Sequence, residues 1–493
     1  MSESFLQALA ALADVGVITA VLIAVAVGLV IGILPGLGGV FALSVMMPFV
    51  YDMEPVQGLA FLLAAHAVVN TGGAIPSILL GIPGTPGCAA TVLDGFPLSR
   101  QGRGGYAVGA ALSASAAGGV FGAIVLVASF PILQRVALLF GSPELFALTL
   151  VGLLAVAALE QGGLVAGLIA GSLGMFLATV GYQEITGVPR FWFGSDYLLD
   201  GFRLVPLLLG LFAIPEILAL MQGDPVAVSP AGSRVAWREV ADGMKSVVRK
   251  WWLLLHSSTV GVLVGIAPGI GGETAGFLAY ALAKRAGREG DRFGTGAIEG
   301  VIAPEASNNS KEGGALVPTL AFGVPGSVGM AVLLGGFLVL GLQPGPDFLV
   351  RHMDIAIAMA LVLAIANVLG VLLLLPVVGW ISKVALVRGR LLAPILLVFV
   401  FAGAYSTTNH PLDVASVFLF GALGHVMKRL NYSRAALVLG FVLGPMIERY
   451  LHISLQAYGP AFLARPIVLV LEGIMFVILL WPWARRLARR ARR

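Results

Sequence analysis

Charged residues are scarce in this sequence. Aspartate, glutamate, lysine and arginine make up 11% of the 493 residues, whereas 58% are hydrophobic, and the mean hydropathy is +0.98. Soluble domains carry about 25% charged residues, so a chain of this length with so little charge is excluded from that class. The composition predicts an all-α, polytopic membrane protein.

Cysteine is almost absent, and motifs for catalysis are missing. The single cysteine, Cys88, excludes an intrachain disulfide framework and a thiolate metal cluster. The six histidines form no His-Glu-x-x-His pair, and no Gly-Lys-Ser/Thr phosphate-binding loop occurs. We therefore expect neither an enzyme nor an ATP-driven pump, and no cofactor. The histidines are His66, His256, His352, His410, His425 and His452.

A basic leader is also missing. Glu3 and Asp14 precede the first apolar stretch, Val15–Leu34, and no lysine or arginine does, so we do not expect a secretory signal peptide. The net charge of +5 does not indicate nucleic-acid binding, because most basic residues lie in short loops and in the tail Arg485–Arg493.

The apolar runs predict roughly 10–14 membrane segments, many of them about 20 residues long. Val15–Leu34 is followed by two short runs, Val40–Val50 and Val56–Val69, which resemble half-helices. The longer runs lie near Tyr106–Ile132, Glu144–Leu159, Leu164–Tyr182, Phe202–Met221, Trp251–Ile266, Ile355–Val378, Leu391–Tyr405, Leu412–Met427, Ala435–Ile447 and Ala464–Trp483.

A polar stretch at 222–250 divides the chain into two halves that repeat each other. GLVIGILPGLGG at 28–39 matches GVLVGIAPGIGG at 261–272, and AIPSILLGIPGT at 74–85 matches LVPTLAFGVPGS at 316–327. We expect a first transmembrane repeat at 1–221, a cytoplasmic linker at 222–250, a second transmembrane repeat at 251–483 and a basic cytoplasmic tail at 484–493. Broken hydrophobic segments at corresponding places in two halves are typical of a transporter binding site.

Charge sets the expected orientation. Loops rich in lysine and arginine stay on the cytoplasmic side, and placing the Arg100/Arg103 loop there also puts 222–250 and the tail inside. The N-terminus is then outside and the C-terminus inside. The two motifs enter from opposite sides, which predicts inverted repeats with broken helices or re-entrant hairpins.

The densest polar run lies in Gly300–Gly329, whose middle reads EASNNSKE. Ionisable groups inside a bilayer are costly and usually functional, and irregular backbone there lines protein or a water-filled cavity. Glycines and prolines on both sides of this run predict such irregular backbone. We interpret the stretch as the floor of a substrate site; a plain extramembrane loop is the alternative.

Four broken tips are predicted to converge near the bilayer midplane, at Gly36–Gly39, Asn70–Gly73, Gly269–Gly272 and Asn308–Gly314. Helix N-termini carry free N–H groups and bind anions; alternatively, these glycines only let helices pack closely. The candidate substrate-binding residues are Gly36, Gly38, Gly39, Asn70, Thr71, Gly72, Gly73, Gly269, Gly271, Gly272, Thr274, Ser307, Asn308, Asn309, Ser310 and Lys311. The candidates for ion coupling are Glu273, Glu305, Glu312, Thr85 and Ser327.

Lys311 is the candidate fixed positive charge for a substrate carboxylate. The alternative is that it only forms an ion pair with Glu305 or Glu312. Hydroxyl, carboxamide and unwound carbonyl oxygens near it can also hold Na⁺, and no other metal site is expected.

The chain resembles the TctA family, the large membrane subunit of tripartite tricarboxylate transporters. The resemblance rests on GILPGLGG (Gly32–Gly39), GIPGTP (Gly81–Pro86), GIAPGIGGETAGFLAYALAKR (Gly265–Arg285) and APEASNNSKEGGALVPTLAFGVPGS (Ala303–Ser327). It implies a bacterial inner-membrane carrier that imports a di- or tricarboxylate, driven by a Na⁺ or H⁺ gradient. It also implies two partners, a small TctB-like membrane subunit and a periplasmic TctC-like solute-binding protein. An ion antiporter or channel on the same repeats is the alternative.

Overall fold

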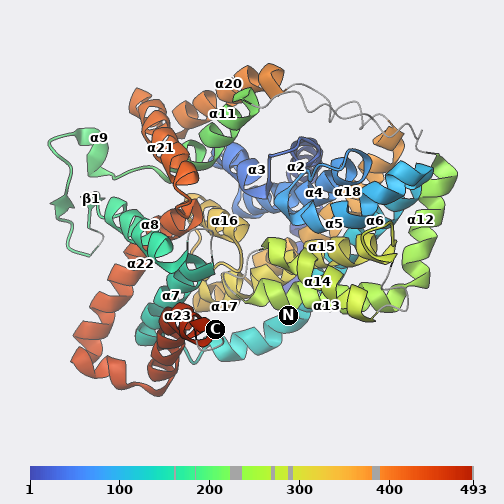
Figure 1. The fold of residues 1–493 in the computed structure, drawn as a ribbon. Coiled ribbons are helices and arrows are strands. Elements are labelled where there is room, and N and C mark those ends of the chain that lie inside the picture. The colour runs from blue at the N-terminus through green and yellow to red at the C-terminus, as the bar shows by residue number, and fades with distance from the viewer. Residues whose placement is uncertain are drawn as a thin grey trace.

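The computed structural model describes residues 1–159, 163–183, 185–222, 236–267, 272–286, 292–379 and 389–490. Within these ranges the chain is almost entirely helical (Figure 1). Its one described sheet is a two-residue antiparallel hairpin of β1 (Gly181–Tyr182) and β2 (Pro189–Arg190), with Gly181 opposite Arg190.

The first half of the chain forms helices and short 3₁₀ or π turns (η). They are α1 (Ser2–Leu12), α2 (Val15–Ile33), α3 (Gly39–Met46), η1 (Met47–Val50), α4 (Pro55–Leu79), η2 (Pro86–Cys88), α5 (Ala89–Leu98), η3 (Ser99–Arg103), α6 (Gly104–Ala137), α7 (Ser142–Leu159), α8 (Gly163–Leu177), α9 (Asp196–Leu199), α10 (Leu204–Leu208), η4 (Leu209–Ala213) and α11 (Ile214–Gln222).

The second half continues in the same way. It contains α12 (Trp237–Arg249), α13 (Trp251–Ile266), α14 (Gly272–Ala286), α15 (Glu299–Phe322), α16 (Val328–Val339), α17 (Pro346–Arg351), α18 (Met353–Leu374), η6 (Leu375–Val377), α20 (Gly389–Thr408), α21 (Pro411–Arg429), α22 (Arg434–Tyr458), η7 (Gly459–Ala464) and α23 (Pro466–Arg490).

Apolar helices dominate the described ranges and confirm the all-α polytopic membrane fold. Seven are long and apolar enough to cross a bilayer, and six shorter apolar helices accompany them. The first of the seven, α2, shows how the sequence sets such a helix. Asp14 caps its N-terminus by accepting hydrogen bonds from the N–H groups of Gly16 (2.7 Å) and Val17 (3.2 Å). Its 19 residues extend about 28 Å, close to the hydrocarbon thickness of about 30 Å.

The polar run predicted to be broken lies inside one continuous helix, α15. Pro304 and Pro318 are both within it, and every residue from Gly300 to Ala321 is buried. α4 is likewise continuous through Asn70–Gly73 and Pro76. The expectation of tips at Asn70–Gly73 and Asn308–Gly314 is therefore wrong, and so is the extramembrane-loop alternative for Gly300–Gly329.

Tertiary packing explains why the glycines of α15 do not break it. A Cβ atom on Gly313 would lie 2.2 Å from the Gly122 carbonyl oxygen of α6, and one on Gly314 would lie 2.2 Å from the Val262 oxygen of α13. These glycines let three helix backbones meet. The alternative that glycines serve close helix packing is correct here.

One predicted break is real. α2 ends at Ile33, and the chain turns through Gly36, whose φ of +89° suits glycine. α3 then begins at Gly39. In the second half, α13 ends at Ile266 and α14 begins at Gly272, while Gly269 and Gly271 lie outside the described residues.

The two halves share their local packing. A Cβ on Gly32 would lie 2.1 Å from the Val69 oxygen, and one on Gly265 would lie 2.2 Å from the Lys311 oxygen. The α2–α4 and α13–α15 pairs thus touch at matching glycines of the repeated motif. The inverted orientation of the repeats, and the division at 222–250, stay predictions.

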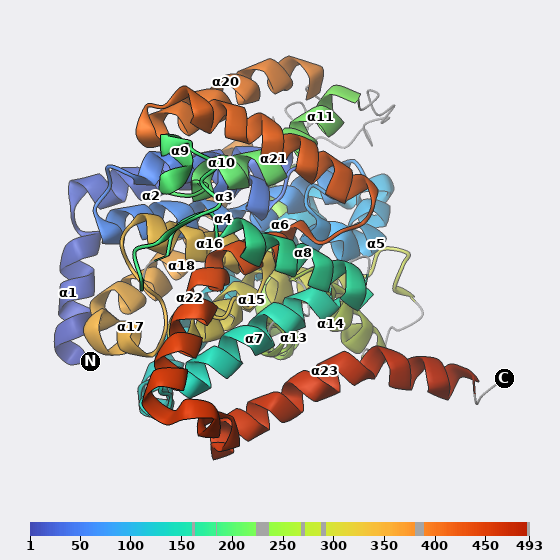
Figure 2. The same ribbon diagram turned by 90° about the vertical axis from the view of Figure 1, so that its left-hand side faces the viewer.

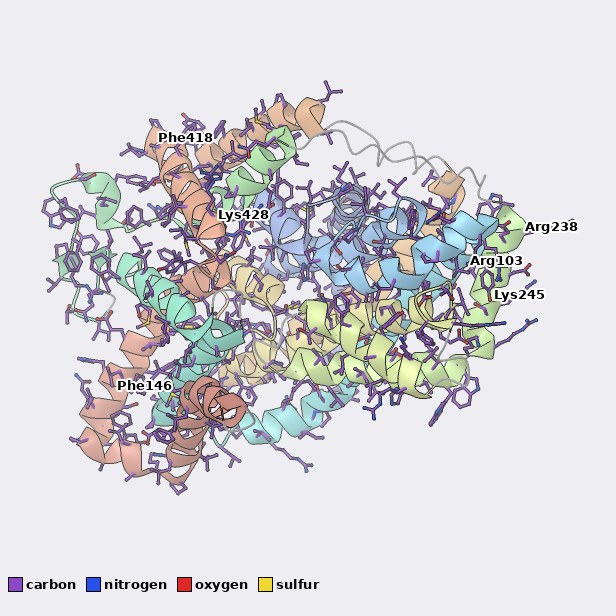
Figure 3. The ribbon with its side chains drawn as sticks, viewed as in Figure 1. Arg103, Phe146, Arg238, Lys245, Phe418 and Lys428 are labelled. Atoms are coloured by element: carbon purple, nitrogen blue, oxygen red, sulfur yellow. The ribbon has the colours of Figure 1, made fainter. Side chains whose placement is uncertain are left out.

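Part of the expected linker is structured. α12 has a strongly amphipathic sequence, and its Gly243 packs on α6, where an added Cβ would lie 2.1 Å from the Tyr106 oxygen. Arg103, Arg238 and Lys245 lie at this edge of the molecule (Figure 3). β1 and α9 lie at the opposite edge (Figure 1). A quarter turn shows α20 and α21 along one margin and α23 along the other, with the core helices between them (Figure 2).

Candidate functional site

Three ionisable side chains meet on one side of α15. The Lys311 Nζ atom lies 3.4 Å from Glu312 Oε1, and Glu312 Oε2 lies 3.2 Å from Nε2 of His66 on α4. The side chains of Lys311 and Glu312 are 9% and 2% exposed. The interaction between Lys311 and Glu312 is therefore an ion pair out of water, with an imidazole at its far end.

The imidazole of His66 lies between the first turns of two short helices. A Cβ on Gly39, the first residue of α3, would lie 2.4 Å from His66 Nδ1. A Cβ on Gly329, the second residue of α16, would lie 2.3 Å from His66 Cε1. Only glycine leaves room for the ring at both places, so one short helix from each half begins beside the charged cluster.

The start of each short helix is a suitable place for an anion. The first N–H groups of a helix have no partner within it and carry partial positive charge. Ser327 caps α16 by accepting a hydrogen bond from the Met330 N–H (3.3 Å), whereas Gly38 at the start of α3 has no side chain to do so. Of the four predicted tips, only Gly36–Gly39 lies at the start of one of these helices, α3; the start of α16 is not among them.

Glu305 lies apart from this cluster. Its Oε1 atom accepts a hydrogen bond from Thr91 (2.5 Å) on α5, and its Oε2 atom accepts one from Ser115 (2.9 Å) on α6. It is fully buried. Of the two alternative partners considered for Lys311, the structure shows Glu312 and not Glu305.

A second, uncharged cluster surrounds Asn70. Thr85 donates a hydrogen bond to Asn70 Oδ1 (2.9 Å), and the Cys88 thiol donates to the Asn70 carbonyl oxygen (3.1 Å). Asn308 donates from Nδ2 toward the Cys88 sulfur at 3.8 Å. A Cβ on Gly87 would lie 2.6 Å from Asn308 Oδ1.

The charged and uncharged clusters occupy matching places in the two halves. The repeated motif aligns Thr85 with Ser327, and each of these residues immediately precedes a short helix, η2 and α16. Two residues beyond them, Gly87 faces Asn308 and Gly329 faces His66. In both halves a glycine near the start of a short helix therefore faces a polar side chain of a long helix. This side chain is the imidazole of His66 on α4 in one case and the carboxamide of Asn308 on α15 in the other.

Asn309 links α15 to two other helices. Its Nδ2 atom donates to Thr71 Oγ1 (2.8 Å) on α4 and to Asn367 Oδ1 (2.6 Å) on α18. The Oδ1 atoms of Asn308 and Asn309 and the Ser307 hydroxyl are buried without a hydrogen-bond partner among the described residues. Carboxamide and hydroxyl oxygens are ligands for hard cations, so they are candidates for a Na⁺ site.

The remaining predicted residues pack helices together, bind another helix, or lie in α14. Gly72 serves packing, since a Cβ there would lie 2.7 Å from the Leu29 oxygen, and Ser310 donates to the Ser258 oxygen of α13 (2.9 Å). Gly73 packs on Thr85. Thr274 lies in the first turn of α14, and the side chain of Glu273 is outside the description. Across the described ranges, no group of three or more His, Cys, Asp or Glu side chains is placed to hold a metal ion.

Four polar residues of the site are absent from the sequence-based candidates: His66, Asn367, Thr91 and Ser115. Two of them carry a signal that could have been used. His66 and Asn367 each interrupt an apolar run of their helix, and such residues in a membrane segment mark function or a buried partner.

Comparison with known families identifies the family of this chain. The model of the "Tripartite tricarboxylate transporter TctA family" matches residues 18–439. The chain belongs to the TctA family. Its predicted membership is confirmed, so this TctA-family chain is a transporter subunit and a multi-pass membrane protein, and tripartite systems include partner subunits.

Two relatives of this TctA-family chain come from Agrobacterium vitis. The chain is 32% identical to the "uncharacterized 52.8 kDa protein in TAR-I ttuC' 3'region" over 472 residues, which covers 93% of the chain and 91% of the relative. It is 35% identical to the "uncharacterized protein in TAR-II ttuC' 3'region" over 220 residues, which covers 44% of the chain and 91% of the relative. No solved structure matches it.

Proposed function

We propose that this TctA-family chain is the membrane carrier of a secondary active system that imports a di- or tricarboxylate across the bacterial inner membrane. It is not an enzyme. It works with a small TctB-like membrane subunit and receives its substrate from a periplasmic TctC-like solute-binding protein. A Na⁺ or H⁺ gradient drives uptake.

The observation that carries the proposal is the buried Lys311–Glu312 pair beside two helix N-termini. An ammonium group has three N–H donors, and Glu312 contacts the Lys311 ammonium at 3.4 Å. The group therefore has donors for a substrate carboxylate. Helix N-termini that point at an anionic substrate group are a recurrent feature of transporters with broken helices, and α3 and α16 supply them here.

The charges of the site support cation coupling. Lys311 brings one positive charge, whereas the buried carboxyl groups of Glu305 and Glu312 bring two negative charges when ionised. A dicarboxylate or tricarboxylate adds further negative charge, and an unpaired buried charge is very costly. The fixed charges do not balance such a substrate, so transported cations must do so. The oxygens of Asn308 and Asn309 are where we place Na⁺.

Orientation follows from the basic loops. The N-terminus is periplasmic and the C-terminus cytoplasmic in this proposal. The edge that holds Arg103, Arg238 and Lys245 (Figure 3) then faces the cytoplasm, and the hairpin of β1 and β2 faces the periplasm.

Uptake into proteoliposomes tests the proposal. The carrier, its small subunit and the binding protein are purified and reconstituted, and uptake of a panel of radiolabelled carboxylates is measured with an imposed Na⁺ or H⁺ gradient. We expect uptake of at least one carboxylate that stops when the gradient is collapsed or the binding protein is omitted. Full uptake by the carrier alone would contradict the tripartite arrangement.

An ion antiporter or channel remains the second candidate, because Glu312 already pairs with Lys311 in the structure. In that case cation flux across the same proteoliposomes would occur without any carboxylate. A carboxylate carrier predicts that Na⁺ or H⁺ movement requires substrate.

A further inference from the structure

A cavity of about 570 Å³ lies well away from the charged cluster. It is open to solvent on one side and is lined by the segment between α8 and α10, by α22, by the last residues of α16 and by Tyr51 after η1. We call it the loop cavity. Its volume falls within the range of about 300–1,000 Å³ that is typical of small-molecule sites.

Arginines give the loop cavity a positive lining. Arg190, Arg203 and Arg449 line it, together with two acids, Asp200 and Glu448. The formal charge of these five residues is therefore positive by one. An arginine-rich concave surface with low-dielectric walls concentrates anions, and the planar guanidinium suits carboxylates.

Two of the arginines are held in place while keeping unused donors. Both terminal nitrogens of Arg190 bind the Glu448 carboxylate (2.7 and 3.0 Å), and Arg203 binds Asp200 (2.8 Å). The Nε atoms of Arg190 and Arg203 are nevertheless buried without a hydrogen-bond partner among the described residues. Because these Nε atoms are closed off from solvent, an anion in the cavity contacts the other N–H groups of the guanidinium, of which each arginine has five in all.

Two further side chains complete the lining. Arg449 is exposed and forms no ion pair with any residue that the structure describes. Burial raises the pKa of Tyr51 to about 12, in spite of the opposing effect of Arg203. The Tyr51 hydroxyl therefore stays protonated at neutral pH and is able to donate to an anion.

The loop cavity is joined to the charged cluster by two short helices. α16 begins beside His66 at Gly329 and ends at Val339 in the cavity wall. Its 12 residues cover about 18 Å. α3 and η1 run from Gly39, also beside His66, to Val50, which is followed by Tyr51 in the cavity wall. The same pair of helices therefore borders both places.

We propose that the loop cavity is an antechamber that binds the carboxylate before it reaches Lys311. This inference rests on the proposed function and deepens it, because it adds a second anion site that faces the periplasm in the proposed orientation. A small anion fits better than a protein segment, because the cavity is of small-molecule size and the exposed Arg449 lies in its wall.

Cysteine labelling tests the site without transport. The single native cysteine, Cys88, is fully buried, so a new thiol in the cavity becomes the accessible one. Ala178→Cys and Val339→Cys place reporters on two separate walls. Labelling is measured in membranes that hold the full chain and its small subunit, with the unsubstituted chain as the blank.

Two reagents of similar size and opposite charge report the local potential, sulfonatoethyl and trimethylammonioethyl methanethiosulfonate. We expect the anionic reagent to react faster, relative to its rate with free thiol, and citrate or succinate to slow both reporters. Arg449→Gln and Arg203→Gln should each weaken this protection by about two- to five-fold, as for a partly exposed charge. Asp200→Asn should strengthen it.

Arg351→Gln is the matched control, because Arg351 is exposed at the end of α17 and does not line the cavity. It should leave the protection unchanged. Equal reactivity of both reagents with no protection by citrate or succinate at either reporter would overturn the antechamber. So would protection by the binding protein alone, which would make the cavity a protein-docking surface. If citrate and succinate protect but no carboxylate is taken up into proteoliposomes, the loop cavity is a carboxylate-binding site, but the proposed function fails and the antechamber role fails with it.

Discussion

Replacing Lys311 by methionine removes the positive charge of the site and keeps much of the stem. A charge-assisted hydrogen bond contributes about 1.5–3 kcal/mol. At about 1.4 kcal/mol for each factor of ten, the apparent affinity for the carboxylate should fall by about one to two orders of magnitude. Initial uptake rates as a function of substrate concentration give this number directly.

The structure adds a complication, because Lys311→Met also leaves Glu312 without its cation. Removing one partner of a buried ion pair costs about 3–5 kcal/mol of stability. The double variant Lys311→Met/Glu312→Gln removes both charges and avoids this loss. It should therefore reach the membrane and unfold at a higher temperature than Lys311→Met, while its affinity for substrate stays low.

A third variant separates the two roles of Lys311. Glu312→Gln keeps the ammonium but leaves it unpaired, so it also loses stability; in the protein that is correctly inserted, carboxylate binding should be retained if Lys311 binds substrate. Lys284→Met is the control, since Lys284 is exposed at the end of α14. Normal affinity and rate in a correctly inserted Lys311→Met protein would refute the reasoning, and Lys311 would then be only the structural partner of Glu312.

Three other predictions concern a glycine beside His66, the turn before α15 and the orientation of the chain in the membrane. Gly329→Ala should abolish uptake, because its Cβ would lie 2.3 Å from the His66 ring, whereas Gly473→Ala, with nothing within 4 Å, should not; uptake per inserted carrier shows the difference. Asp94 accepts three backbone hydrogen bonds from the turn before α15, from Gly294, Gly296 and Ala297. Asp94→Ala should therefore lower the thermal unfolding temperature and expose that turn to protease. Reporter fusions should place the N-terminus outside and the C-terminus inside; two cytoplasmic ends would refute the inverted arrangement.

Composition and hydropathy were sufficient to predict the class of fold. The apolar runs near Tyr106–Ile132 and Leu412–Met427 agree closely with α6 and α21, because a helix that crosses a bilayer must be long and apolar whatever it packs against. The turn at Gly36 was also predictable, since PGLGG combines a proline with several flexible residues. Neither prediction needs knowledge of a tertiary contact.

The interior of α4 and α15 could not be predicted in this way. Glycine lets a chain turn, and it also lets two helix backbones touch; Gly313 and Gly314 serve the second purpose, against Gly122 and Val262. The sequence alone does not distinguish these uses, because the difference lies in what other helices bring to the same place. Tertiary packing outweighs the low helix propensity of glycine here.

The contact between Glu312 and His66 could not be predicted from the sequence for a related reason. His66 is 246 residues away along the chain and sits in an apolar run without a recognisable motif. The two come together because glycines at 39 and 329 leave a space for the imidazole. The polar run of α15 was correctly located from the sequence, but its neighbours were not.

An experimental structure of the carrier with its small subunit and a transported carboxylate tests the central claim most directly. We predict substrate density within hydrogen-bonding distance of the Lys311 Nζ atom, at the N-termini of α3 and α16. Density elsewhere, with the Lys311–Glu312 pair still closed and out of reach of the substrate, would contradict the site proposed for this chain.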